Sequence, residues 1–253
     1  MTVTLIGAGN LATQLALALH ERGIKINQVY SRTNESAKTL ADLVCAKHTT
    51  CANDIEDGAD FYIYSLKDDA LDEIISQTAA QDGIHLHTAG SVDMSIFQGR
   101  KKRHGVMYPM QTFSKSKKVD FGKIPVFVEG SDNETAESIK ALAKRLSDNV
   151  TDCDSRQRMT LHLGAVFCCN YSNYLYRVAE KLMNDQGLDF KVMLPLLEET
   201  VEKLRTLTAK DAQTGPAARH DMSVINKHIK ALESYPAYQK LYEDLAGRIM
   251  NEK

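Results

Sequence analysis

The chain opens on a short apolar segment that runs directly into a glycine-rich turn, and no other feature constrains its fold as strongly. Residues 3–6 are mainly apolar, and residues 7–12 read GAGNLA, which has the form GxGxxA. In a strand–turn–helix unit, the first glycine allows the tight turn, the second lets a pyrophosphate approach the backbone, and the small last residue lets the helix pack on the strand. We therefore predict a dinucleotide-binding unit in which the helix start faces the phosphates. The cofactor contacts predicted here are Gly7, Ala8, Gly9, Asn10 and Leu11.

The residues after the second predicted strand indicate which dinucleotide binds. That strand, residues 28–31, leads into Arg32 without an acidic residue. Sites that prefer NAD place an Asp or Glu here, where it binds the ribose 2′-hydroxyl. Ser31 can instead donate to a 2′-phosphate, and Arg32 can pair with that phosphate or stack on the adenine. We predict NADP(H) as the cofactor; the alternative is that Arg32 is only an exposed side chain.

The remaining pattern divides the chain into two parts. Strand-like and helix-like segments alternate up to about residue 152, which predicts an α/β Rossmann domain with a doubly wound, mostly parallel sheet over residues 1–152. From residue 153 onward the pattern is helical throughout, and residues 155–184 read as one long helix. We expect residues 153–253 to form an all-helical domain for substrate binding and dimerisation.

Composition and residue spacing exclude several classes of function. The net charge is −2, so no overall basic field favours nucleic acid. No apolar run approaches the ~20 residues that span a bilayer, and the first residues do not resemble a signal peptide. The five cysteines are odd in number and form no CxxC pair, which is typical of reduced thiols in a cytoplasmic protein. The histidines show no metal-ligand spacing, so we expect no metal site.

Several sequence blocks spread along the chain carry a resemblance to a known family. They are HTAGS at 87–91, YPMQTF at 108–113, LHLGAVF at 161–167, NYSN at 170–173 and QTGPAARHD at 213–221. With them the chain resembles a bacterial family that joins a Rossmann-like domain to an uncharacterised helical domain and is labelled as NADP oxidoreductases. It is related to pyrroline-5-carboxylate reductases and β-hydroxyacid dehydrogenases. The resemblance implies a helical domain like that of 6-phosphogluconate dehydrogenase, and a homodimer formed through it.

Polar and small residues follow several predicted strands, where ligands of such sheets bind. Ser65, Leu66 and Lys67 would lie over the middle of the cofactor, and Ala89 and Gly90 would let the nicotinamide come close. The substrate contacts predicted from these ends and from the helical domain are Ser91, Tyr108, Gln111, Thr112 and Arg219. Each strand end could also be an ordinary turn, and Arg219 could serve either a substrate carboxylate or a structural ion pair.

The long predicted helix carries the candidate catalytic residues. His162, Val166, Asn170 and Asn173 are spaced by four, four and three residues, which places them on one helix face. In β-hydroxyacid dehydrogenases a lysine occupies the position of Val166 and exchanges a proton with the substrate oxygen. Since imidazoles exchange protons near neutral pH, we predict that His162 replaces it, with Asn170 and Asn173 orienting the substrate. The alternative is a core histidine paired with a neighbouring helix.

These observations favour an NADP(H)-dependent oxidoreductase that transfers hydride to or from a small oxo or imino substrate held between two domains. Because the lysine is missing, a second interpretation is a non-catalytic protein that binds NADP(H) for sensing or stability. A third interpretation is a deazaflavin reductase. The sequence does not identify the substrate.

Overall fold

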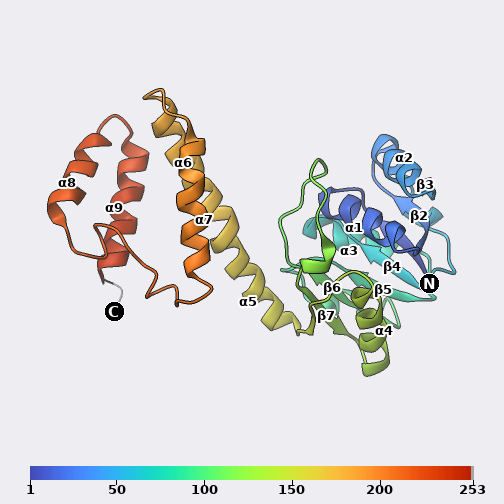
Figure 1. The fold of residues 1–253 in the computed structure, drawn as a ribbon. Coiled ribbons are helices and arrows are strands. Elements are labelled where there is room, and N and C mark those ends of the chain that lie inside the picture. Colours follow the sequence, from blue (N-terminus) through green and yellow to red (C-terminus); the bar gives the residue numbers. More distant parts are fainter. Residues whose placement is uncertain (252–253) are drawn as a thin grey trace. The chain divides into compact units, whose positions relative to one another are not determined.

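The computed structural model describes residues 1–251. These residues form two compact units, which divide between Asn170 and Tyr171 (Figure 1). In the described residues, the first unit is built on an eight-stranded sheet with the order β3-β2-β1-β4-β5-β6-β7-β8. The strands are β1 (Thr2–Ile6), β2 (Lys25–Tyr30), β3 (Lys47–Thr49), β4 (Phe61–Tyr64), β5 (Ile84–His87), β6 (His104–Pro109), β7 (Val126–Gly130) and β8 (Val150–Asp152). Among the strand pairs of the described residues, only β6–β7 is antiparallel.

The strand order reverses at β1, which pairs with β2 on one side and β4 on the other. From β1, the connection to β2 runs toward one edge of the sheet, and the connection to β4 runs toward the other edge. A crevice therefore opens beyond the carboxyl ends of β1 and β4. The glycine-rich turn at residues 7–9 lies at this crevice because it directly follows β1. The fold therefore places the predicted dinucleotide motif where such sheets bind their ligands.

Helices cover both faces of the sheet. The apolar residues of α1 (Asn10–Glu21), α2 (Asn34–Leu43) and α4 (Asn133–Lys144) pack in one buried cluster, and those of α3 (Asp68–Gln77) pack in another. The second cluster includes Tyr62, Tyr64 and Phe97, the last from the 3-10 turn η2 (Met94–Phe97). Two further 3-10 turns are η1 (Ala52–Asp54) and η3 (Phe121–Lys123). The sheet is therefore doubly wound, as the sequence predicts.

The last helix of the first unit differs from its prediction. α5 (Ser155–Ala165) begins at a capping box, in which the Asp154 carboxylate accepts from the Gln157 N–H and the Gln157 side chain accepts from the Asp154 N–H. It continues into a π-helical segment, η4 (Val166–Tyr171), before α6 (Ser172–Asn184) begins. The prediction of one regular helix over 155–184 is therefore wrong at its centre.

The second unit is helical in its described residues. After α6 it contains η5 (Phe190–Met193), α7 (Leu194–Lys203), α8 (Met222–Ala231) and α9 (Pro236–Asn251). Its buried apolar cluster is small and contains Ala217, Ile225 and Ala246. The units divide at residue 170, whereas the predicted boundary at 152 follows the change in element type. None of the described helices is both long and apolar enough to cross a membrane.

Candidate functional site

A cleft of about 720 Å³ lies beyond the carboxyl ends of β1, β2 and β4. Its lining contains most of the predicted cofactor contacts: Gly7, Ala8, Gly9, Ser31, Arg32, Ser65, Leu66 and Lys67. Asn10 and Leu11 form the first turn of α1 directly beside it. The structure therefore brings together residues from three separate loops that the sequence assigned to one ligand.

Gly7 and Gly9 have different roles in shaping this cleft. Gly7 has a φ of +127°, and an added Cβ would collide with the carbonyl oxygen of Ser65, so the turn cannot accept a larger residue. A Cβ added to Gly9 would meet nothing within 4 Å. Gly9 is also the N-cap of α1 and has no side chain that could cap the helix. The space beside Gly9 is therefore open, and the unpaired N–H groups at the start of α1 face it. A pyrophosphate would fit at this position.

The end of the cleft beyond β2 is lined by hydroxyl groups and one guanidinium. Ser31 and Arg32 line it together with Thr33 and Ser36. The Thr33 hydroxyl accepts a 3.4 Å hydrogen bond from the Ser36 N–H and so caps α2. Thr33 and Ser36 were not predicted as cofactor contacts, although a Thr just before a helical segment is typical of an N-cap. This group of donors suits a 2′-phosphate.

A second hollow, of about 460 Å³, lies beside α5 and the loop that follows β6, within the first unit. His162 lines it, and its Nδ1 lies 3.2 Å from the hydroxyl of Tyr108. The two rings meet edge to face with their centroids 6.1 Å apart. Burial raises the pKa of Tyr108, so this phenol keeps its proton at neutral pH. We call this hollow the His162 pocket; Met110, Gln111, Thr112, Val166 and Asn170 also line it.

His162 packs closely against the loop that follows β5. A Cβ added to Gly90 would lie 2.5 Å from His162 Nδ1 and 2.9 Å from His162 Cβ, so only glycine allows this approach. The predicted nicotinamide-facing residue and the predicted proton donor are therefore in contact. The sequence assigned both residues but did not predict their proximity, because 72 positions separate them.

A buried ion pair holds α5 in this position. Arg158 is 1% exposed, and its Nη1 donates to Glu129 Oε2 of β7 at 2.5 Å. Its Nη2 donates to the carbonyl oxygen of Val92, in the loop after Gly90, at 2.5 Å. The hydroxyl of Ser155 donates to Glu129 at 2.7 Å and accepts from the Met94 N–H at 3.1 Å. The start of α5 is thus tied both to β7 and to the loop that carries Gly90.

The other residues that were predicted to contact the substrate lie in several different parts of the chain. Ser91 donates a hydrogen bond to Asp68 at the start of α3. Gln111 and Thr112 are exposed and bond to each other, since Gln111 Oε1 accepts from the Thr112 N–H at 2.8 Å. Asn173 and Arg219 belong to the second unit. The Ala89 N–H donates to Nδ1 of His87 at 3.2 Å, so its loop is held by a buried histidine.

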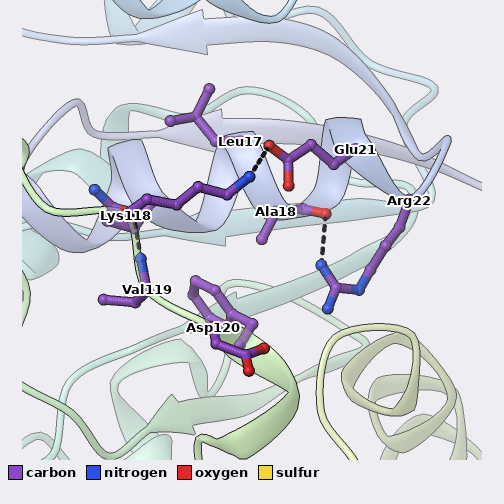
Figure 2. Close-up of a pocket in the computed structure, with 9 residues that line it drawn as sticks. Leu17, Ala18, Glu21, Arg22, Lys118, Val119 and Asp120 are labelled. Carbon is purple, nitrogen blue, oxygen red and sulfur yellow. Dashed lines mark hydrogen bonds and ion pairs between the residues drawn. The ribbon is translucent and has the colours of Figure 1, made fainter.

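A third hollow, of about 430 Å³, lies beside the second half of α1 (Figure 2). Lys118 in its wall donates to Glu21 at 2.7 Å, and Arg22 donates to the Ala18 carbonyl at 3.3 Å. Its charges are therefore paired within the protein. Since α1 starts at the cofactor cleft, its second half leads away from that cleft. Among the described residues, no group of three or more His, Cys, Asp or Glu side chains could hold a metal ion.

Comparison with known proteins identifies the family. Residues 2–86 match the family model described as NADP oxidoreductase, coenzyme F420-dependent, and residues 124–249 match a domain of unknown function, DUF2520. The crystal structure of a "putative NADP oxidoreductase" from Bacteroides fragilis is 48% identical, with a TM-score of 0.94 over 99% of this chain and 98% of that one. The chain belongs to this family of NADP oxidoreductases.

More distant structures share the fold of this chain. A Thermotoga maritima protein is 20% identical, with a TM-score of 0.72 over 98% of this chain and 96% of that one. An imine reductase from Myxococcus stipitatus, in complex with NADP+, is 14% identical, with a TM-score of 0.68 over 98% and 93%. No curated protein matched the chain. The comparisons confirm the predicted family and fold class, and NADP(H), the predicted cofactor, is the cofactor of this family.

Proposed function

We propose that this NADP oxidoreductase transfers hydride between NADP(H) and a small oxo or imino substrate, with His162 exchanging the accompanying proton. The observation that carries the proposal is the contact between Gly90 and His162. Gly90 follows β5 at the edge of the sheet where the cofactor cleft opens, and His162 lines the neighbouring pocket. A proton donor is thus held next to the loop predicted to face the nicotinamide.

The cofactor fits the cleft through this chain's own residues. Gly7 and Gly9 would receive the pyrophosphate at the start of α1, and Ser31, Arg32 and Ser36 would bind the 2′-phosphate. When bound, NADPH supplies the hydride. The protein's contribution is to hold the acceptor carbon beside it and to provide the proton.

Tyr108 is the group that would orient His162. Its protonated hydroxyl is within hydrogen-bond distance of Nδ1, so a phenol that donates to Nδ1 leaves the exchangeable proton on Nε2. Asn170, which lines the same pocket, would hold the substrate. Val166 stands where related dehydrogenases have a lysine, so the proton must come from another group.

We also propose that the protein forms a homodimer through its helical unit. In α6 and α7, no described side chain is buried, and several apolar ones are largely exposed. In α7, Leu196 is 61% and Val201 is 60% exposed, and Val192 of the adjoining η5 is 67% exposed. An apolar surface of this kind is typical of an interface, and the small core of the unit leaves little else to stabilise it.

Assays of NADPH oxidation over a panel of neutral ketones, keto acids and cyclic imines test the proposal. The matching family description also names coenzyme F420, so a deazaflavin acceptor belongs in the panel as the second candidate. Oxidation with a ketone or imine supports the proposal. Oxidation with the deazaflavin alone would replace it, and tight NADPH binding with no turnover on any acceptor would favour a sensing protein.

A further inference from the structure

The wall of the His162 pocket is poor in charged side chains. Among the residues that the structure describes, no Asp, Glu, Lys or Arg contributes to its lining. The lining is formed largely by apolar or weakly polar groups, such as Met110, Leu161, Ala165, Val166 and the thiols of Cys168 and Cys169. Burial raises the pKa of Tyr108, so this phenol adds no charge to the wall at neutral pH.

The buried Arg158 is already paired with a carboxylate and does not line the pocket. Arg158 lies one helical turn before His162 on α5, but its guanidinium is paired with Glu129 and donates to the carbonyl of Val92 and the hydroxyl of Ser155. Releasing it for a substrate would leave the Glu129 carboxylate, whose side chain is 16% exposed, without its counter-ion. Such a loss costs several kcal/mol. Arg158 therefore cannot serve as a carboxylate receptor in this pocket.

We propose that the acceptor presents an uncharged, apolar body to the His162 pocket, with its carbonyl or imine group directed at His162. The physical reason is desolvation: a carboxylate moved into this pocket would lose water and gain no cation. An aliphatic ring or chain would instead gain from contact with Val166, Leu161 and Met110. The inference rests on the proposed function and narrows its substrate class to neutral ketones and imines.

A matched pair of acceptors tests the inference. Cyclohexanone and 4-oxocyclohexanecarboxylate share the reacting carbonyl and the ring and differ in one carboxylate. With NADPH and the full-length protein, kcat/KM for the neutral ketone should exceed that for the acid by about 10- to 100-fold, which corresponds to ~1–3 kcal/mol of uncompensated desolvation. Equal values, or a preference for the acid, would overturn the inference.

A binding measurement separates this inference from the proposed function. The alcohols cyclohexanol and 4-hydroxycyclohexanecarboxylate can be titrated into the NADP+ complex by ligand-observed NMR, which needs no turnover. Selective binding of the neutral alcohol supports the inference even if no ketone is reduced, in which case only the proposed function fails. Selective binding of the acid, or binding of neither, contradicts the inference.

A substitution in the pocket wall supplies the internal control. Val166→Lys places a cation in the lining and should move the preference toward the acid by at least 10-fold, because the carboxylate then has a partner. Leu43→Lys makes the same kind of change at the end of α2, where Leu43 is 52% exposed and outside the pocket. It should leave the ratio unchanged. An unchanged ratio in the correctly folded Val166→Lys protein would contradict the inference.

Discussion

Arg32 is the residue whose side chain most directly decides between the two nicotinamide cofactors. It is exposed, it lines the cofactor cleft, and the hydroxyls of Ser31 and Ser36 line the cleft with it. A guanidinium that pairs with a phosphate contributes about 1.5–3 kcal/mol, and this contribution exists only for the cofactor that carries the 2′-phosphate.

Arg32→Ala should therefore raise the Kd for NADPH by about 10- to 100-fold and leave the Kd for NADH within about twofold. Titration of cofactor fluorescence gives both constants. Lys38→Ala is the matched control: it also removes a nearby positive charge, but Lys38 is paired with Asp42 on α2 and does not line the cleft. If Arg32→Ala weakened the binding of NADPH and NADH equally, Arg32 would not be the residue that binds the 2′-phosphate.

Individual residues could be assigned from sequence wherever one local geometry required one residue type. Gly7, Gly9, Ser31 and Arg32 were predicted in this way, since a tight turn and a missing acidic residue are visible in the sequence itself, and all four line one cleft. The contact of Gly90 with His162 could not be found, because it depends on how α5 packs against the loop after β5. Arg158 was missed because nothing in its local sequence indicates an ion pair with a residue on β7.

At the scale of elements, the position of α5 depends on the ion pair between Arg158 and Glu129. Both ends of this pair lie largely out of water, at 1% and 16% exposure of their side chains. Removing one member leaves the other charge without compensation, which typically costs 3–5 kcal/mol.

Arg158→Met should thus lower the free energy of unfolding by about 3–5 kcal/mol, as measured by urea denaturation. Arg156→Met changes the same residue type two positions earlier, where Arg156 is exposed, and should stay within about 0.5 kcal/mol of the native protein. Similar losses in both variants would show that Arg158 does not anchor the helix.

The π-helical segment explains where the helix prediction went wrong. Regular α-helical spacing predicts that His162, Asn170 and Asn173 share one face, but η4 interrupts that spacing between the histidine and the two asparagines. Cys168 and Cys169 consequently join Asn170 in the lining of the His162 pocket. A π segment is set by hydrogen bonds to the fifth residue along the chain, and the pattern of apolar residues does not record it.

At the scale of the whole molecule, two buried histidines on β5 link its stability to pH. Burial lowers the pKa of His85 and of His87 to about 3, and the nearby cations Lys101 and Arg158, respectively, lower them further. The unfolded chain binds these protons below its ordinary histidine pKa of about 6.5, and the folded chain does not. The stabilisation is therefore complete above about pH 6.5 and is lost as the pH falls toward 3.

Between pH 7 and pH 5, each of the two histidines should reduce the free energy of unfolding by about 2 kcal/mol. Urea denaturation at both pH values measures the total. His87→Asn should remove about half of this pH dependence, whereas His20→Asn, at an exposed position on α1, should not change it. A pH dependence that is the same in both variants would contradict the assignment.

The second unit gives the clearest test of the proposed dimer. Leu196→Glu places a charge on the exposed apolar surface and should raise the dimer dissociation constant at least 10-fold, since an unpaired carboxylate resists burial. Sedimentation equilibrium measures this constant. Leu43→Glu, at an exposed site in the first unit, is the control and should have no effect. A native protein that remains monomeric at high concentration would contradict the dimer.

The division into a wound sheet followed by helices was predictable, because alternation of strands and helices is visible along the chain and ends near residue 152. The short edge strands β3 and β8 were not, since three-residue strands carry too few side chains to show a pattern. The division of the compact units at residue 170 also lay beyond the sequence, because it reflects the long-range bonds of Arg158 and His162.

The central claim is that His162 supplies the proton when NADPH reduces the acceptor. Its most direct test is the single-turnover rate of NADPH oxidation, at saturating NADPH and the best acceptor of the panel, in the native protein and in His162→Gln. We predict a fall of about 10²- to 10⁴-fold with an unchanged Kd for NADPH. Native-like rates in His162→Gln would contradict the account.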